Sequence, residues 1–164
     1  MTHKIIDNFL DKQDFIKIKN IIYNTSSFPW YCSHDHVASK LTKGDGSCFY
    51  HTLFENKKSV SFFSGLILKT IFKNIKHKEI IRAKVNLYPG TSKIKEHGMH
   101  IDQHFKHKGV ILYVNNNDGY TKLYDGTKIE SIENRALFFD SSKKHCSTTC
   151  TNADSRININ INYK

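Results

Sequence analysis

The hydrophobic pattern changes its period about half-way along the chain, and this change constrains the fold more than any other feature of the sequence. In the N-terminal part, Phe15, Ile18 and Ile22 recur at helical spacing. In the later part, apolar and polar residues alternate through residues 81–88, until Pro89 interrupts them. Alternation with a period of two is typical of a β-strand with one buried face. Helices followed by many short strands predict an α+β domain, with the helices covering one face of a β-sandwich or barrel.

Turn-forming residues divide the later part of the chain into short segments. They cluster at 115–119, 125–126 and 140–142, where Asn, Asp, Gly and Ser predominate. Between these turns the pattern predicts further strands at 99–103, 109–114, 120–123, 136–139 and 156–163. No internal repeat, low-complexity linker or domain boundary is present. We therefore expect residues 1–164 to form a single domain, with helical support in about 1–79 and a β core in about 80–164.

Two helices are expected before the strands. The first follows a short strand at 5–10, takes Asp11 as its N-cap and ends near the polar residues 24–27. The second lies within 54–75. Its predicted apolar stripe, the face that would pack against the core, consists of Phe63, Leu66, Ile67 and Ile71.

Two segments between these helices have a different character. Pro29 keeps the aromatic cluster at 28–31 out of a helix, and we expect its side chains to pack in the core. Residues 34–48 are polar and rich in turn formers. Such a segment folds over a site as a lid or forms a plain surface loop, and the sequence leaves both open.

The composition is that of a folded protein outside the secretory pathway. A chain of 164 residues with 38% hydrophobic residues can bury a sizeable core. No long apolar signal segment follows Met1. The most apolar run, 61–72, is interrupted by Ser64, Gly65 and Lys69, which argues against a membrane span. We therefore expect a cytoplasmic protein with no membrane partner.

The chain carries a formal net charge of +10, from 25 basic and 15 acidic side chains. An excess of this size attracts nucleic acid or another anionic partner when it is concentrated on one surface. In the sequence the lysines are scattered, and no long basic run or basic-aromatic repeat appears. Solvated surface lysines are therefore the simpler interpretation, and a nucleic-acid partner remains an alternative.

The four cysteines, Cys32, Cys48, Cys146 and Cys150, are expected to be free thiols rather than a disulfide framework. Cys146 and Cys150 follow His145, so a structural zinc site could be considered. However, no CxxC pair is present, and ordinary packing is favoured over zinc.

The tripeptide His100-Ile101-Asp102 is the strongest candidate for chemistry. On an extended strand, residues two positions apart project from the same face, so His100 and Asp102 would present an imidazole and a carboxylate side by side. A second histidine, His145, follows the predicted strand 136–139. Two histidines and one carboxylate on one face of an ion form the facial triad of non-haem Fe(II) oxygenases, which leaves coordination positions open for reactants.

Residues 82–161, about half of the chain, resemble the double-stranded β-helix core of the Fe(II)/2-oxoglutarate-dependent dioxygenases. The likeness is strongest to the prolyl-hydroxylase-like branch, including its small phage- and virus-type members. It is carried by three strand segments, NLYPG (86–90), ILYVN (111–115) and RALFFD (135–140), together with the His100-Ile101-Asp102 tripeptide, His145 and Arg156. Because a His-x-Asp tripeptide occurs by chance in many proteins, the likeness depends on the order and context of all these parts. It implies a jelly-roll core with N-terminal supporting helices.

The resemblance assigns a role to each of these residues. His100, Asp102 and His145 would hold Fe(II) and form the catalytic centre. The cosubstrate 2-oxoglutarate and O2 would bind at the iron. The resemblance also allows ascorbate as a further cofactor. Arg156 would pair with the far carboxylate of 2-oxoglutarate, since a guanidinium binds a carboxylate through two parallel hydrogen bonds.

Two tyrosines also match family positions. Tyr113 would donate a hydrogen bond to the far carboxylate of the cosubstrate, and Tyr88 would line the iron pocket. For both, a buried core tyrosine with a satisfied hydroxyl is the alternative. The asparagines Asn158 and Asn160 alternate with isoleucines on the last strand, and simple strand alternation is favoured over a role in the site.

Other donors near the tripeptide are weaker candidates. Only His100 stands two residues before an Asp, so we expect surface or supporting roles for His97, His104 and His107. Asp140 is expected to set a turn rather than bind metal.

The expected reaction is hydroxylation of a C–H bond with release of succinate and CO2, and the prolyl-hydroxylase likeness favours a protein or peptide substrate. A nucleic-acid demethylase or base hydroxylase of the same superfamily is the first alternative. Such demethylases usually carry a second arginine six positions after the cosubstrate arginine, where this chain has Asn162. A non-catalytic binding module on this fold is a further alternative. So is a zinc-dependent hydrolase, which would leave Arg156 unexplained.

Overall fold

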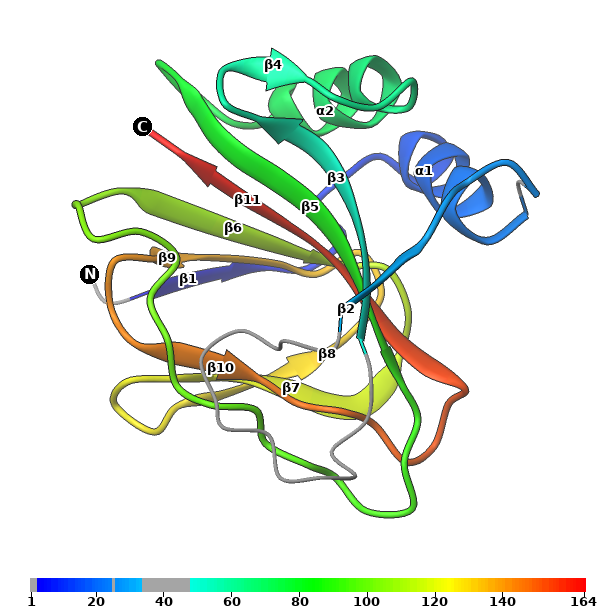
Figure 1. The fold of residues 1–164 in the computed structure, drawn as a ribbon, viewed down its shortest axis with the longest axis vertical. Helices are drawn as coiled ribbons and strands as arrows, with labels where there is room; N and C mark the ends of the chain where they lie inside the picture. Colours follow the sequence, from blue (N-terminus) through cyan, green and yellow to red (C-terminus); the bar gives the residue numbers. More distant parts are fainter. Residues whose placement is uncertain (1–2, 25, 34–47) are drawn as a thin grey trace.

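The computed structural model describes residues 3–24, 26–33 and 48–164, and eleven strands and two helices lie among them (Figure 1). In chain order the elements are β1 (His3–Ile6), α1 (Lys12–Asn24), β2 (Tyr31–Ser33), β3 (Cys48–Glu55), β4 (Lys58–Ser59), α2 (Ser64–Phe72), β5 (Ile80–Pro89), β6 (Lys108–Tyr113), β7 (Asn117–Leu123), β8 (Lys128–Ser131), β9 (Ala136–Asp140), β10 (His145–Ser147) and β11 (Ser155–Tyr163).

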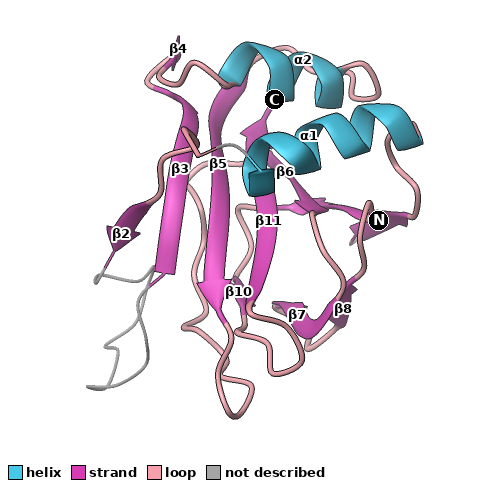
Figure 2. Ribbon diagram, turned by 90° about the vertical axis from the view of Figure 1, so that its right-hand side faces the viewer, coloured by secondary structure: helices cyan, strands magenta, loops and turns pink. Residues whose placement is uncertain are grey.

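The strands form two antiparallel sheets that face each other (Figure 1). The larger has eight strands in the order β1-β9-β6-β11-β5-β3-β2, with β4 paired to β3, and the smaller has the order β10-β7-β8. Both helices pack on the outer face of the larger sheet, away from the smaller one (Figure 2). The fold is a double-stranded β-helix with helical support, as the α+β prediction required.

The last strand, β11, lies between β6 and β5 at the centre of the larger sheet. Its side chains alternate between the two faces. Ile157, Ile159 and Ile161 join the hydrophobic core beneath the helices, and the inner face carries Arg156 and Asn158. The alternation predicted for residues 156–163 is confirmed, and it aims the polar residues of β11 into the space between the sheets.

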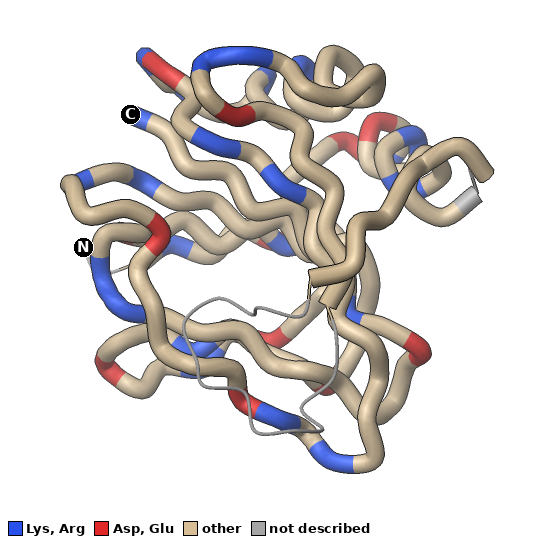
Figure 3. The backbone as a smooth tube through the Cα atoms, viewed as in Figure 1, with Lys and Arg blue, Asp and Glu red and all other residues tan. Residues whose placement is uncertain are grey.

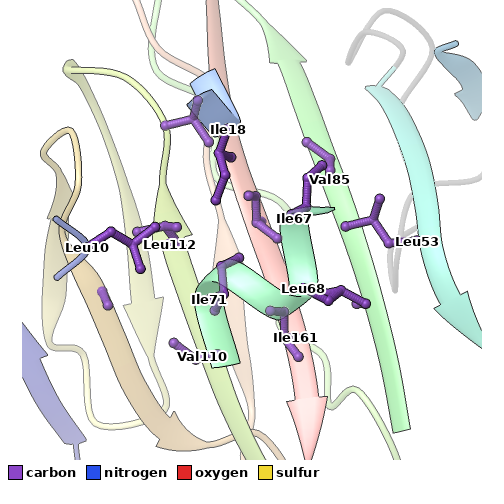
Figure 4. Packing of buried hydrophobic residues seen from close by; sticks show 14 of the residues in the cluster. Leu10, Ile18, Leu53, Ile67, Leu68, Ile71, Val85, Val110, Leu112 and Ile161 are labelled. Atoms are coloured by element: carbon purple, nitrogen blue, oxygen red, sulfur yellow. The ribbon is translucent and has the colours of Figure 1, made fainter. Parts of the chain in front are cut away.

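Helix α1 begins where the sequence predicts. The Oδ1 atom of Asp11 accepts a hydrogen bond from the backbone N–H of Gln13 at 2.9 Å, which is an N-cap interaction. Phe15, Ile18 and Ile22 are all buried against the larger sheet, where Figure 4 shows Ile18 close to the strand residues of the core. The predicted packing of the aromatic cluster is confirmed only in part. Phe28 is buried and its ring meets that of Trp30 edge-on at 5.1 Å, whereas Tyr31 is 55% exposed.

The second helix is shorter than the predicted range, and a different face of it is buried. It begins only at Ser64, because β3 and a tight turn occupy the preceding residues. In that turn Asn56 and Lys57 both have positive φ, which is typical of the two-residue connection of a β-hairpin. The buried stripe contains Ile67, Leu68 and Ile71, whereas Leu66 is 54% exposed, so its predicted place in the stripe is wrong. Figure 4 shows Ile67, Leu68 and Ile71 pointing toward the sheet.

Several strands were not predicted from the sequence. Residues 1–79 were expected to provide one short strand, at 5–10, and helical support. The short strand is present as β1, at 3–6, but these residues also contribute β2, β3 and β4 to the larger sheet. The short strands β8 and β10 were not predicted either. Conversely, 99–103 is not a strand, since it makes a single isolated bridge, between His100 and His145.

The proposed lid at 34–48 falls outside the described residues except for Cys48, which begins β3. Neither described helix has the length and apolar character needed to cross a membrane.

Candidate active site

His100, Asp102 and His145 come together between the two sheets and form a donor cluster. One ligand atom of each lies within 4.8 Å of the others. The Nε2 atom of His145 lies 3.6 Å from Asp102 Oδ2, and the Nε2 atom of His100 lies 3.9 Å from Asp102 Oδ1. The two imidazole rings are 4.6 Å apart, centroid to centroid. The structure therefore places the three predicted metal ligands in one group.

The backbone holds this cluster in a different way from the predicted strand. His100 and His145 exchange two backbone N–H···O=C hydrogen bonds of 2.9 Å, which ties the loop after β5 to the start of β10. The backbone N–H of Asp102 donates to the carbonyl of Ser141 at 3.2 Å, just beyond β9. Residues 99–103 are therefore not extended. Their backbone bonds to His145 and Ser141 bring the side chains of His100 and Asp102 to the same side of the loop.

Each imidazole is oriented by a bond to a backbone carbonyl. The Nδ1 atom of His100 lies 3.1 Å from the carbonyl oxygen of Gly98, and that of His145 lies 3.0 Å from the carbonyl oxygen of Lys143. A carbonyl oxygen only accepts, so each Nδ1 carries the hydrogen and each Nε2 presents its lone pair toward Asp102. Metal-binding histidines usually show this pattern, because the bond at one nitrogen fixes the tautomer at the other.

The Asp102 carboxylate is buried and surrounded by donors. Its Oδ1 accepts from Arg82 Nη2 at 2.9 Å, and its Oδ2 accepts from the Ser141 hydroxyl and, at 3.4 Å, from Asn160 Nδ2. Burial raises the pKa of Asp102, but the neighbouring His145, the Arg82 guanidinium and the bond from Ser141 outweigh it, so the pKa is lowered overall. The carboxylate is therefore held in the anionic form that a cation requires.

The His100 imidazole is held in the complementary state. Burial and the neighbouring His145 lower the pKa of His100, which favours the neutral imidazole. An anionic carboxylate and imidazole nitrogens with free lone pairs form a donor set that suits Fe(II). The residues present thus fit a divalent iron site.

Arg156 lies deeper between the sheets and has no solvent exposure. Its guanidinium donates to three hydroxyls: Nε to Ser131 Oγ at 2.6 Å, Nη2 to Thr121 Oγ1 at 3.1 Å, and Nη1 to Ser147 Oγ. No described carboxylate forms an ion pair with it. Burial is the main influence on its pKa and lowers it. A buried cation that meets only neutral groups is energetically costly, and it marks a place where an anion can bind.

Two adjoining hollows lie at the donor cluster, and the inner one is lined by Thr121 and Ser147, whose hydroxyls bind the Arg156 guanidinium. The outer one, of about 220 Å³, reaches Arg82, His100 and Asp102, and the inner one, of about 30 Å³, reaches His145 and Thr121. Tyr88, Ser147 and Asn160 line both. Asn158 and Asn160 line the inner hollow, which follows from the predicted strand alternation, and a role for them in the site stays a prediction.

No protein-family model and no curated protein matches this sequence. Several solved structures resemble its fold. The first is an oxidoreductase of the 2OG-Fe(II) oxygenase family from Burkholderia pseudomallei, with a TM-score of 0.73 and 12% identity over 99% of this chain and 84% of that chain. The second is a prolyl hydroxylase from Trichoplax adhaerens in complex with a hypoxia-inducible-factor peptide fragment, with a TM-score of 0.63 and 19% identity over 98% and 82% of the two chains. The third is OsALKBH1, with a TM-score of 0.64 and 12% identity over 99% and 97%.

The chain has the fold of the 2OG-Fe(II) oxygenases. Within this oxygenase fold both predicted tyrosines flank Arg156, with ring centroids 5.6 Å (Tyr88) and 5.5 Å (Tyr113) from the guanidinium carbon. Tyr113 is fully buried, and its hydroxyl donates to Thr121 Oγ1 at 2.8 Å. Burial raises the pKa of both phenols, that of Tyr88 to about 12, so both are neutral donors.

The other residues considered as possible metal ligands lie outside the donor cluster. His97 lines the outer hollow beside Tyr88, and His104 is exposed on the surface. Asp140 sets the turn after β9, as predicted, by accepting from the backbone N–H of Ser142 at 3.2 Å. Cys146 and Cys150 are buried free thiols outside the donor cluster, which agrees with the packing interpretation rather than the zinc one.

Sequence reasoning missed the residues that support the site. Arg82 could have been found, because it shares the parity of Tyr88 on the alternating strand β5 and so faces the same side. Thr121, Ser131 and Ser147, which bind the Arg156 guanidinium, carry no comparable signal, since small hydroxyl residues on short strands are common everywhere.

Proposed function

We propose that this protein is an Fe(II)- and 2-oxoglutarate-dependent dioxygenase that hydroxylates a C–H bond. The observation that carries the proposal is the presence, in one interior, of a donor cluster for a cation and a buried arginine without a described anionic partner. Bound iron, with 2-oxoglutarate and O2, supplies the chemistry: one oxygen atom enters the C–H bond, the other enters succinate, and CO2 is released.

The chain's own residues have distinct tasks in this reaction. The Nε2 atoms of His100 and His145 and the carboxylate of Asp102 would hold the iron from one side, leaving the remaining positions open. Arg82 and Ser141 bind the Asp102 oxygens and so orient the carboxylate. Such outer contacts typically alter metal affinity by about 10–100-fold.

Arg156 would bind the far carboxylate of 2-oxoglutarate. Its nitrogens lie among hydroxyl groups in a dry interior, where a charge-assisted hydrogen bond to a carboxylate is strong. The hydroxyls of Tyr113 and Thr121 stand next to the guanidinium and would complete the pocket for this carboxylate. Tyr88 would form the wall between cosubstrate and substrate, as it lines both hollows.

A protein or peptide is the substrate class that we favour. The support is the sequence likeness to prolyl hydroxylases, together with a fold neighbour that was solved with a bound peptide fragment. A nucleic-acid substrate is the second candidate, supported by the formal charge of +10. Against it, Asn162 occupies the place of the second arginine of demethylases, and it is buried at 1% exposure.

The proposal is tested by turnover of the cosubstrate. The purified chain is incubated with Fe(II) and 2-oxoglutarate without oxygen, O2 is admitted, and succinate is measured with and without a peptide pool. We expect succinate from the native chain and none from His100→Ala. The matched control, His104→Ala, removes an exposed histidine four residues away and should retain the activity.

Binding measurements separate this proposal from a non-catalytic module. The anaerobic complex with iron and 2-oxoglutarate should show a charge-transfer absorption band, which His100→Ala should abolish. If neither the band nor succinate appeared with any substrate pool, the oxygenase proposal would be wrong. A band without succinate would favour a binding module.

A further inference from the structure

A second and larger hollow lies away from the donor cluster, on the side of the molecule where both chain ends are found (Figure 1). Its volume is about 680 Å³, which is within the range of ligand sites. Strands β1, β6, β9 and β11 line it, and no residue of α1 or α2 does. We call it the lysine groove.

The strand register places much of this groove on the outer face of the larger sheet. Lys4 of β1 lies opposite Phe138 of β9, and Lys108 of β6 lies opposite Tyr163 of β11. Directly opposite residues share a face. Phe138 and Tyr163 belong to the core on the helix side, so the groove lies where the helices leave the ends of these strands uncovered.

The groove concentrates positive charge. It is lined by five lysines, Lys4, Lys78, Lys106, Lys108 and Lys164, and by one carboxylate, Asp140. Lys164 pairs with Glu79 at 3.3 Å, whereas none of the other four forms an ion pair with a described carboxylate. Figure 3 shows blue segments on the side of the molecule that carries both chain ends. Five lysines that are scattered in the sequence are therefore brought together here by the fold.

The floor of the groove has two aromatic rings that a ligand could reach. Phe138 lines it and is partly buried, and nearby Phe105 is 45% exposed, with the ammonium group of Lys164 5.0 Å from its ring centroid. Phe139 and Tyr163 also line the groove, but both are buried. Basic side chains around aromatic rings form the usual site for a single-stranded nucleic acid, because the cations follow the phosphates while bases stack on the rings.

His107 is an independent sign that the groove takes a ligand. It lines the groove, yet its side chain is almost fully buried, at 4% exposure. Its Nδ1 atom lies 2.8 Å from the carbonyl oxygen of Phe105 and therefore carries the hydrogen. Its Nε2 atom is a buried acceptor without a described partner. Such an atom is costly to leave unsatisfied, and an amino or imino group of a base would donate to it.

We propose that the lysine groove binds single-stranded nucleic acid. The four unpaired lysines would meet phosphates, the aromatic floor would meet bases, and His107 Nε2 would accept from a base. An acidic peptide would satisfy the lysines but would not specifically require the aromatic floor. A duplex presents no unstacked bases to that floor. The proposal concerns binding outside the donor cluster and is independent of the oxidation proposed above.

The test uses the full chain and a fluorescent dT12 oligonucleotide, with anisotropy measured from 50 to 300 mM NaCl in the absence of iron and 2-oxoglutarate. Contacts with three or four phosphates predict a slope of log K against log salt of about −2 to −3. Replacing Lys4, Lys106 and Lys108 together by Ser should weaken binding at least tenfold at 100 mM NaCl. It should also make the salt dependence shallower, with a slope between about −1 and 0.

The control variant replaces Lys57, Lys58 and Lys69 by Ser, which removes the same charge from exposed positions on the β3–β4 turn and α2. It should keep its affinity within about twofold. Equal losses in the two variants, or no binding at 50 mM NaCl, would overturn the proposal. If a twelve-residue polyglutamate bound as tightly as dT12, the ligand of the groove would be an acidic peptide and the proposal of nucleic acid would be wrong. Since no step needs iron, a negative result here leaves the oxygenase proposal standing.

Discussion

The two ends of the interior between the sheets differ in charge. At one end the donor cluster brings an anionic carboxylate and imidazole lone pairs within 4.8 Å of one another, and the carboxylate already pairs with Arg82 at 2.9 Å. At the other end Arg156 is a buried cation that donates only to neutral hydroxyls. The arginine end is the costlier of the two as packing alone, because its buried charge has no described counter-charge. A single ligand that chelates a metal held by the donor cluster and carries a distant carboxylate would serve both ends, and 2-oxoglutarate has this chemistry.

The largest effect should come from removing the carboxylate of the donor cluster. Asp102→Ala deletes a metal ligand, so we expect Fe(II) affinity to fall by more than about 100-fold, beyond the range seen for supporting contacts. Anaerobic titration calorimetry measures this loss. Asp125→Ala, an exposed carboxylate in a turn, is the control and should bind iron like the native chain. Unchanged iron affinity in Asp102→Ala would place the metal elsewhere.

The opposite end should respond to a change that preserves charge. Arg156→Lys keeps a cation but loses the planar fork, so 2-oxoglutarate affinity should fall by about 10–100-fold, corresponding to about 1.5–3 kcal/mol for hydrogen bonds to a charged group. Iron affinity should stay within twofold. The same exchange at Arg135, whose guanidinium pairs with Asp7 near the surface, is the control. A parallel loss of iron and cosubstrate binding would contradict the separation of the two ends.

A smaller effect, with a defined pH dependence, is expected for Arg82→Met. Arg82 helps to lower the pKa of Asp102, so its loss raises that pKa and lets protons compete with iron at higher pH. Iron affinity should fall about tenfold at pH 7 and further at pH 5.5, more steeply than in the native chain. Lys84→Met, the next basic residue lining the same hollow, is the control. Equal pH profiles for Arg82→Met and the native chain would exclude the electrostatic role.

The smallest effect separates the two interpretations of Tyr113. Tyr113→Phe removes only the hydroxyl, and the loss of one hydrogen bond to the cosubstrate should weaken 2-oxoglutarate about 3–10-fold, or about 1 kcal/mol. Tyr120→Phe, whose hydroxyl donates to the exposed Glu96, should have no effect on this affinity. If Tyr113 is only a core residue, its variant would change thermal stability and leave the cosubstrate Kd unaltered.

The sequence predicted those parts of the molecule in which one strand carries a complete pattern. The alternation through β5 and β11 showed which residues face inward, and Arg156 and Tyr88 were found on that basis together with the family likeness. The donor cluster required the likeness, because the bridge between His100 and His145 joins residues that no local pattern connects.

Other parts were not predictable because their cause is tertiary. Strands β8 and β10 have four and three residues, too few to display a period, and they carry Ser131 and Ser147. The end of strand β3 lies inside the range 54–75 predicted to contain the second helix, and the turn at Asn56 and Lys57 separates the strand from that helix. The lysine groove joins residues from β1, β6 and β11, so its charge could not be located from a sequence in which the same lysines are far apart.

The central position of β11 has a consequence for synthesis of the protein. The strand that fills the middle of the larger sheet is synthesised after the other ten described strands, and β5 and β6 can be joined only after it arrives. Until then two halves of a sheet would expose open edges, which are prone to wrong pairing. The same strand brings Arg156, so the nascent chain has no buried cation in its interior before its sheet is closed. A chain cut before β11 would therefore lack both the centre of its larger sheet and this arginine.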